Sequence, residues 1–141
     1  MTTINKQFTL AARPQGLVKR SDFAYAEAPV PELRDGELLV QILYISLDPA
    51  MRGWMNEGKS YIRPVAIGEV MRAGTIGKVV ASKNPRYKTG EYVAGSQGVQ
   101  TYAVSDGKDL HKVDPKLALL PKYLCVLGMP VMTAYSGLLD T

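Results

Sequence analysis

Alternating apolar and polar positions predict several short strands separated by turns. The clearest strand is Glu37–Leu47, in which the face that begins at Leu38 and the face that begins at Leu39 are both largely apolar. Because apolar residues occupy both faces, we expect this strand to be central and mostly buried. The same pattern predicts further strands at Gln7–Ala12, Phe23–Ala28, Ala73–Ser82, Glu91–Ala94, Gln100–Val104 and Leu110–Val113. Short strands at this spacing favour a β-barrel or a β-sandwich.

Two segments carry helix signals. Asp48 is suited to cap a helix and Pro49 to occupy its first position, which predicts a short helix over Ala50–Met55. Asp114-Pro115 is a similar start signal for a helical region over Lys116–Leu127, and the helical pattern continues after Gly128.

Within this last segment Pro130 falls near the first turn, where its missing N–H costs nothing. Met129 and Thr133 are four residues apart, so a helix places both side chains on one face.

Composition narrows the class of protein. The 141 residues are 46% hydrophobic and 21% charged, which is typical of one folded domain. The formal charge of +4 is dispersed over 17 basic and 13 acidic residues, so no nucleic-acid-binding tail is expected. Neither a signal peptide nor a membrane span is visible, and we expect a cytoplasmic protein.

Metal chemistry has few candidate ligands in this chain. Zinc requires three or four Cys, His or carboxylate ligands. The chain has one cysteine and one histidine, Cys125 and His111, and they lie in unrelated contexts. Cys125 lies in an apolar run and is interpreted as a core residue, while His111 is expected to be exposed. We therefore expect no metal site.

Two motifs resemble a known superfamily. Tyr44-Ile-Ser-Leu-Asp-Pro-Ala-Met-Arg-Gly53 and Leu127-Gly-Met-Pro-Val-Met-Thr-Ala-Tyr-Ser-Gly-Leu-Leu-Asp140 are similar to segments of the medium-chain dehydrogenases/reductases. The resemblance is to the zinc-free group of leukotriene B4 dehydrogenase, prostaglandin reductase and curcumin reductase. It implies a mainly β fold with a few short helices, a GroES-like, partly open β-barrel over residues 1–127. Residues 128–141 would form a helix leading toward a nucleotide-binding Rossmann domain that these 141 residues do not include.

The resemblance also implies a reaction and a set of site residues. In that group hydride passes from NADPH to the β-carbon of an α,β-unsaturated aldehyde or ketone. By resemblance, Tyr61 and Arg52 are candidate catalytic residues, Met129 and Thr133 candidate cofactor contacts, and Ala50 and Met51 candidate substrate-pocket residues. Relatives commonly carry a tyrosine where this chain has Ala50, and the loss of that ring would open the substrate pocket or remove a wall that sandwiches a flat substrate. Family members often dimerise through the nucleotide-binding domain, so a homodimer of the full-length protein is an open possibility. The isolated 141 residues are expected to be inactive.

Other interpretations remain open. One is a quinone oxidoreductase of the same superfamily. A second is a non-catalytic GroES-like binding module, although no long mobile loop with an apolar anchor is visible. A third, a small nucleic-acid-binding barrel, would require clustered basic residues with interleaved aromatics, and only 8% of the residues are aromatic.

Overall fold

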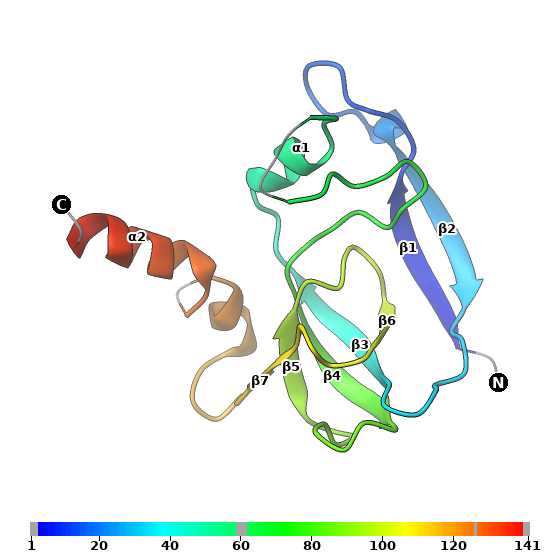
Figure 1. Cartoon of the computed structure of the whole chain (residues 1–141), viewed down its shortest axis with the longest axis vertical. Helices are drawn as coiled ribbons and strands as arrows, with labels where there is room; N and C mark the ends of the chain where they lie inside the picture. The colour runs from blue at the N-terminus through cyan, green and yellow to red at the C-terminus, as the bar shows by residue number, and fades with distance from the viewer. Residues whose placement is uncertain (1–2, 59–61, 126, 140–141) are drawn as a thin grey trace.

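Two open, antiparallel β-sheets form the body of the protein in the computed structural model, which describes residues 3–58, 62–125 and 127–139 (Figure 1). The smaller sheet pairs β1 (Ile4–Leu10) with β2 (Phe23–Pro29). The larger sheet has the strand order β6-β3-β4-β5-β7. Its strands are β3 (Leu38–Ile45), β4 (Thr75–Ser82), β5 (Tyr92–Gly95), β6 (Tyr102–Ser105) and β7 (His111–Val113). The prediction of a mainly β chain whose barrel is not fully closed is confirmed.

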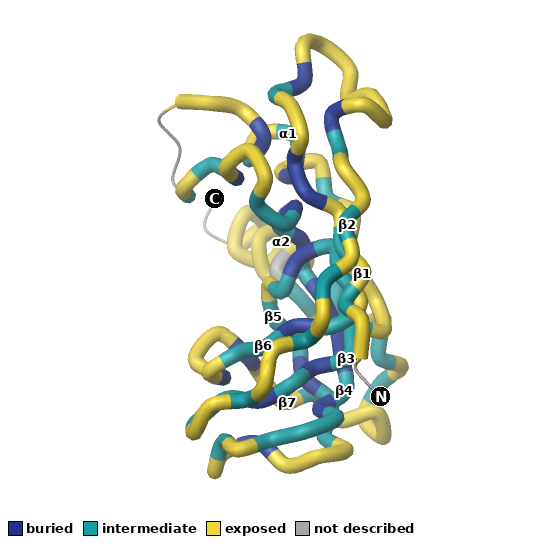
Figure 2. The backbone as a smooth tube through the Cα atoms, turned by 90° about the vertical axis from the view of Figure 1, so that its right-hand side faces the viewer, coloured by how far each residue is buried: buried dark blue, intermediate teal, exposed yellow. Residues whose placement is uncertain are grey.

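Main-chain hydrogen bonds join β1 to the segments that precede β4 and β6 of the larger sheet. The N–H of Phe8 donates to the carbonyl of Val99 over 3.0 Å, and the N–H of Met71 donates to the carbonyl of Phe8 over 2.9 Å. Two apolar clusters fill the space behind these strands, and Figure 2 shows the buried positions concentrated there. One cluster lies under α1 (Ala50–Trp54) and contains Leu10, Met51, Met55, Val65, Met71 and Ala73. The other lies on the larger sheet and contains Leu38, Val40, Val79, Tyr87, Val93 and Leu110.

The predicted central strand is central, but only its first half is buried. β3 lies between β6 and β4, and Leu38 and Val40 are fully buried. Leu43 and Tyr44 are exposed, which contradicts the expectation that the strand is mostly buried. The reason is that β6 pairs with β3 only as far as Gln41, so the second half of β3 has one neighbouring strand fewer.

The predicted first helix is present as α1, but Asp48 does not cap it. Pro49 is the N-cap residue, and no side chain caps the first turn. The carboxylate of Asp48 instead accepts a hydrogen bond from the hydroxyl of Ser46, over 2.7 Å. Its backbone carbonyl accepts the N–H of Met51. The side chain that was expected to cap the helix is therefore engaged two residues upstream.

The prediction of a helical region over Lys116–Leu127 is wrong. The carboxylate of Asp114 accepts the N–H of Lys116 over 2.8 Å and closes a tight turn instead of starting a helix. Only a short 3-10 helix, η2 (Leu120–Leu124), follows before α2 (Met129–Leu139). The interpretation of Cys125 as a core residue is also wrong, because Cys125 is exposed just after η2. The helix predicted after Gly128 is confirmed, and it projects from the β-sheets (Figure 1).

The helices of the described residues include none with the length and apolar character that crossing a membrane requires.

Candidate functional site

An apolar groove of about 510 Å³ lies where α1, η2 and the start of α2 meet the larger sheet. Its apolar lining comes from Ala50, Trp54, Ile62, Ala94, Leu124 and Pro130. Its polar lining comes from Ser46, Asp48, Arg72, Ser96 and Tyr123. A concave apolar surface with a few polar groups is the usual form of a small-molecule site.

Local backbone geometry brings these distant segments together. The chain leaves β3 at Ser46, whose N–H donates to the carbonyl of Gly74 over 2.8 Å and so fixes the approach to α1 beside β4. At the other end of α1, the carbonyl of Trp54 accepts the N–H of Val65 over 2.8 Å. These two bonds hold α1 against the segments that carry the other groove residues.

Arg72 is the cationic residue of the groove lining. Its Nη1 donates to the carbonyl of Arg63 over 2.9 Å, and its guanidinium carbon lies 5.6 Å from the centroid of the Trp54 ring. A cation held over an aromatic face in this way is attracted by the ring. Asp48 is the anionic residue of the lining, and its carboxylate accepts the Ser46 hydroxyl.

Comparison with known proteins decides the family. Residues 6–113 match the family described as the N-terminal domain of oxidoreductase. The chain belongs to this oxidoreductase family. It is 43% identical over 140 residues to the putative NADP-dependent oxidoreductase YfmJ of Bacillus subtilis (strain 168), covering 99% of this chain and 41% of that protein. It is also 43% identical to the NADPH-dependent curcumin reductase of Escherichia coli (strain K12), covering 96% of this chain and 39% of that protein.

A solved relative has the same fold. The crystal structure of CurA from Vibrio vulnificus in complex with NADPH aligns with a TM-score of 0.88 and 44% identity, over 96% of this chain and 40% of that one. The chain thus spans about two fifths of the length of the relatives that it matches. These findings confirm the resemblance to the curcumin reductase group.

The groove of this oxidoreductase domain contains one of the residues predicted from sequence. Ala50, at the start of α1, is among the residues that line it, and its role as a substrate-pocket residue stays a prediction. Thr133 lies on α2 with its side chain exposed, and Met129 is the first residue of the same helix, with its side chain outside the described part. Tyr61 also lies outside the described residues.

The structure places Met51 and Arg52 away from the groove of the oxidoreductase domain. Met51 is 8% exposed, packs in the cluster under α1 and is not among the described residues that line the groove. The guanidinium of Arg52 donates to the carbonyls of Pro14 and Gly16, over 3.2 and 3.0 Å, and to the side chain of Asn56. These contacts are structural, and a place for either residue in the substrate cleft stays a prediction. A catalytic role for Arg52 stays a prediction to be tested.

Sequence reasoning missed Trp54 and Arg72. Trp54 could have been found, because it lies four residues after Ala50 and therefore on the same face of a helix. Arg72 gave no local signal, since it precedes β4 and reaches the groove only through tertiary packing.

The described part of the groove holds no cluster of metal ligands. Over the ranges that the structure describes, no three His, Cys, Asp or Glu residues are placed to share a metal ion. Hydrogen bonds from Lys88 and Lys112 lower the pKa of Glu91. Hydrogen bonds from Lys108 lower the pKa of Asp106, and the same side-chain pairing raises the pKa of Lys108. A hydrogen bond to Glu27 raises the pKa of Tyr25 on β2. None of these groups lines the groove.

Proposed function

We propose that this chain supplies the substrate-side wall of an NADPH-dependent oxidoreductase that reduces the C=C bond of α,β-unsaturated aldehydes or ketones. The observation that carries the proposal is the apolar groove between α1 and α2, present in a chain that is 43% identical to an NADPH-dependent curcumin reductase. Within this proposal the domain covers residues 1–127 and residues 128–141 lead toward the nucleotide-binding part.

The residues of the chain fit the nicotinamide end of NADPH. Ala50 and Pro130 leave an apolar opening that can accept the edge of a flat ring, and Thr133 offers a hydroxyl on the adjoining helix. We assign Met129 and Thr133 to cofactor contact on this basis. When bound, NADPH supplies the hydride. The glycine-rich turn that holds a dinucleotide pyrophosphate would have to come from outside the described residues.

The chain's own part in the reaction is to bind, orient and keep water out. Trp54 and Leu124 offer apolar walls for the carbon skeleton of the substrate, and desolvation there strengthens any hydrogen bond to the carbonyl oxygen. We keep Tyr61 as a candidate donor to that oxygen. The small side chain of Ala50, at a position where relatives commonly carry a tyrosine, leaves room for a bulkier substrate.

Further features of the proposal concern the rest of the protein. We propose a zinc-independent reaction, because the only cysteine and the only histidine, Cys125 and His111, lie on different elements of the fold and outside the groove. We also propose that the protein is cytoplasmic, that it has no nucleic-acid partner, and that the full-length protein forms a homodimer.

A chimaera tests the proposal. Residues 1–141 are joined to the remaining part of the Escherichia coli curcumin reductase, and NADPH oxidation is measured with an enal, an enone and a quinone. We expect turnover of the enal and the enone by the chimaera, and none by the isolated chain. Turnover of the quinone alone would favour a quinone oxidoreductase, and a folded chimaera with no turnover would contradict the proposal.

A filled groove provides the sharper version of this experiment. Ala50→Trp in the chimaera is expected to raise the KM for the enone at least about tenfold, because the ring occupies substrate space. Ala24→Trp, at an exposed position on β2, is the matched control and should leave the KM unchanged.

A further inference from the structure

We propose that the outer edge of β2 is a docking site for an extended segment of a partner protein, which adds a strand antiparallel to β2. The segment that fits carries a basic residue opposite Glu27 and an aromatic residue opposite Tyr25. In recognition of this kind, main-chain hydrogen bonds hold the segment and its alternate side chains select it. The site is separate from the groove, because neither residue lines the groove.

The first argument is the direction of the main-chain groups of β2. This strand pairs with β1 alone and lies at the margin of the molecule (Figure 1). On β1, the N–H and the carbonyl of Phe8 both bind the segments that precede β6 and β4, on the side away from β2. Phe8 lies opposite Tyr25 in the register, and opposed residues of an antiparallel pair point their main-chain groups the same way, either toward each other or apart. The main-chain groups of Tyr25, and of Glu27 two residues later, therefore point to the outer edge.

The second argument is that this edge is unpaired in the described chain. Outside the β1–β2 ladder, no hydrogen bond among the described residues uses the main-chain N–H or carbonyl of Tyr25 or Glu27. At one end of β2 the N–H of Phe23 already donates to the carbonyl of Arg20, and at the other end Pro29 has no N–H. The edge that can accept a strand is thus centred on Tyr25 and Glu27, and an unpaired edge is a template for another strand.

The third argument is that β1 shows which side chains fit beside β2. The register places Lys6 opposite Glu27 and Phe8 opposite Tyr25. The rings of Phe8 and Tyr25 meet edge to face, with their centroids 5.6 Å apart, and remain 45% and 54% exposed. An aromatic residue on the other side of Tyr25 can repeat this contact and cover apolar surface that water now reaches.

The fourth argument is the charge of Glu27. Its carboxylate accepts the Tyr25 hydroxyl, a bond that raises the pKa of Tyr25. The four ion pairs found among the described residues do not include Glu27. A carboxylate can accept further donors, and opposite charges on facing residues of two strands stabilise their pairing, whereas like charges destabilise it. A basic residue opposite Glu27 is therefore favoured and an acidic one is disfavoured.

Synthetic peptides of seven residues, the length of β2, test the site. The Lys peptide is acetyl-Thr-Thr-Lys-Thr-Phe-Thr-Thr-amide, in which an antiparallel strand sets Lys opposite Glu27 and Phe opposite Tyr25. The Glu peptide has Glu in place of Lys, and the methylated peptide carries an N-methyl group on Phe, which removes the donor to the carbonyl of Tyr25. Each is titrated into the nitrogen-15-labelled chain, and the amide signals are followed by NMR.

We expect the Lys peptide to shift the amide signals of Tyr25 and Glu27 and to leave those of the groove residues unchanged. It should bind about fivefold more tightly than the Glu peptide, because one facing pair changes from opposite to like charge. It should also bind about fivefold more tightly than the methylated peptide, which has lost one main-chain hydrogen bond.

Three variants test the role of Glu27. Glu27→Lys should reverse the preference, so that the Glu peptide binds more tightly than the Lys peptide, and Glu27→Gln should remove most of the preference. Glu32→Lys is the matched control, because it makes the same change of charge at an exposed residue just beyond β2 and should keep the preference of the parent chain. Circular dichroism of each variant verifies that it is folded.

Several results would overturn the proposal. These are equal affinity for the Lys and Glu peptides, equal affinity for the Lys and methylated peptides, a preference that survives in Glu27→Lys, the same reversal in Glu32→Lys, and no shift of the Tyr25 and Glu27 amides with any peptide. If Glu27→Lys does not fold, Glu27→Gln decides, and an undiminished preference in that variant counts against selection by charge. Self-association of the chain that shifts the same amides without peptide would assign the edge to a second copy instead of a partner.

Discussion

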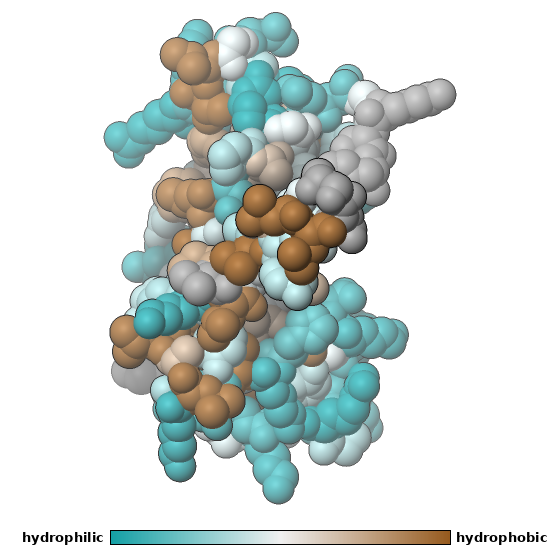
Figure 3. Space-filling model, turned by 90° about the vertical axis from the view of Figure 1, so that its left-hand side faces the viewer, coloured by the Kyte–Doolittle hydropathy of each residue, from teal (hydrophilic) through white to brown (hydrophobic). Residues whose placement is uncertain are grey.

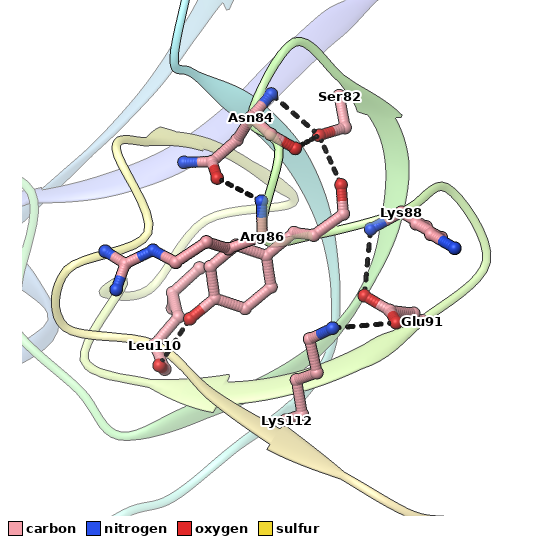
Figure 4. Close-up of polar contacts among 8 residues, drawn as sticks. Ser82, Asn84, Arg86, Lys88, Glu91, Leu110 and Lys112 are labelled. Atoms are coloured by element: carbon pink, nitrogen blue, oxygen red, sulfur yellow. Dashed lines mark hydrogen bonds and ion pairs between the residues drawn. The ribbon is translucent and has the colours of Figure 1, made fainter.

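The two ends of the larger sheet differ in how completely their polar groups are paired. At the end that contains Tyr87, the Tyr87 hydroxyl donates to the carbonyl of Leu110 over 2.6 Å and lies 2.9 Å from that of Gly107. The Ser82 hydroxyl donates to the carbonyl of Tyr87 (Figure 4). The side-chain amide of Asn84 donates to the carbonyls of Gly36 and Asp106. We call this region the Tyr87 end.

At the groove end, apolar side chains are exposed. Figure 3 shows apolar side chains gathered on the face that carries α2. The exposed apolar residues of α2 are Val131, Met132, Tyr135, Leu138 and Leu139. Leu43, Tyr44 and Leu47 are exposed at the end of β3 and just beyond it. The comparison teaches that paired polar groups stabilise the fold at one end, while the other end exposes apolar surface of the kind that marks interaction sites.

The largest effect is expected at Gly77, where β4 packs tightly against β3. A Cβ atom at this position would overlap the side chain of Val40 and lie 2.5 Å from the carbonyl oxygen of Gln41. Because that oxygen belongs to the backbone of the neighbouring strand, the clash cannot be relieved by a rotamer change. Gly77→Ala should lower the free energy of unfolding by about 3 kcal/mol or more, measured by urea denaturation.

Gly53→Ala is the matched control for Gly77→Ala. No atom lies within 4 Å of the added Cβ, and the position is inside α1. Alanine is the better helix former, so stability should stay the same or rise by up to about 1 kcal/mol. Equal losses of stability in both variants would show that the tight packing of Gly77 against β3 is not the cause of the loss.

Tyr87→Phe sharpens the comparison by removing one hydroxyl and keeping the ring. Tyr87 is 7% exposed, so the carbonyl of Leu110 would lose its hydrogen bond in a buried place. We expect a loss of about 1 to 3 kcal/mol in the free energy of unfolding. Tyr25→Phe is the control, because the Tyr25 hydroxyl binds Glu27 at the surface and should contribute almost nothing. Equal effects of the two substitutions would contradict the distinction between buried and exposed hydroxyls.

Arg52→Gln tests whether Arg52 belongs to the fold or to the reaction. Its bonds to the carbonyls of Pro14 and Gly16 fasten a surface loop to α1, so we expect a loss of about 1 kcal/mol in stability. The kcat of the chimaera should not change. A fall in kcat of more than about tenfold at unchanged stability would assign Arg52 to catalysis instead.

The sequence predictions that succeeded were based on regular local patterns. The alternation along Ala73–Ser82 and Phe23–Ala28 predicted β4 and β2 because a strand's side chains must alternate between two environments. The burial of β3 could not be predicted in full, since it depends on where β6 ends. The sequence identified Ala50 as a candidate residue but not Arg72, because the place of Arg72 in the groove depends on contacts between remote segments.

Helix start signals predicted the structure less well than strand patterns did, because an Asp side chain can form other local hydrogen bonds in place of a helix cap. Asp48 binds Ser46 and Asp114 closes a turn, although both precede proline and both were predicted to start helices. In each case a local side-chain hydrogen bond replaced the expected cap. Such competition is invisible in a single sequence.

The smallest effect is expected from the ion pair at the edge of the Tyr87 end. The carboxylate of Glu91 accepts the N–H of Lys88 over 2.8 Å and the Nζ of Lys112 over 2.9 Å, and both bonds lower its pKa (Figure 4). The fold therefore favours the charged carboxylate. The resulting stability is present above the ordinary pKa of 4.5 and is lost as the pH falls through the lowered value.

Glu91→Gln should remove this part of the acid dependence of the melting temperature, whereas Lys112→Gln should remove only some of it, because the main-chain bond from Lys88 is the larger cause. Glu32→Gln, an exposed carboxylate, is the control and should melt as the parent does across the same pH range. The effect is small because water screens a pair at the surface. If Glu91→Gln shifted the melting temperature as much as Tyr87→Phe, surface pairing would matter as much as buried pairing, and the contrast between the two ends could not rest on burial.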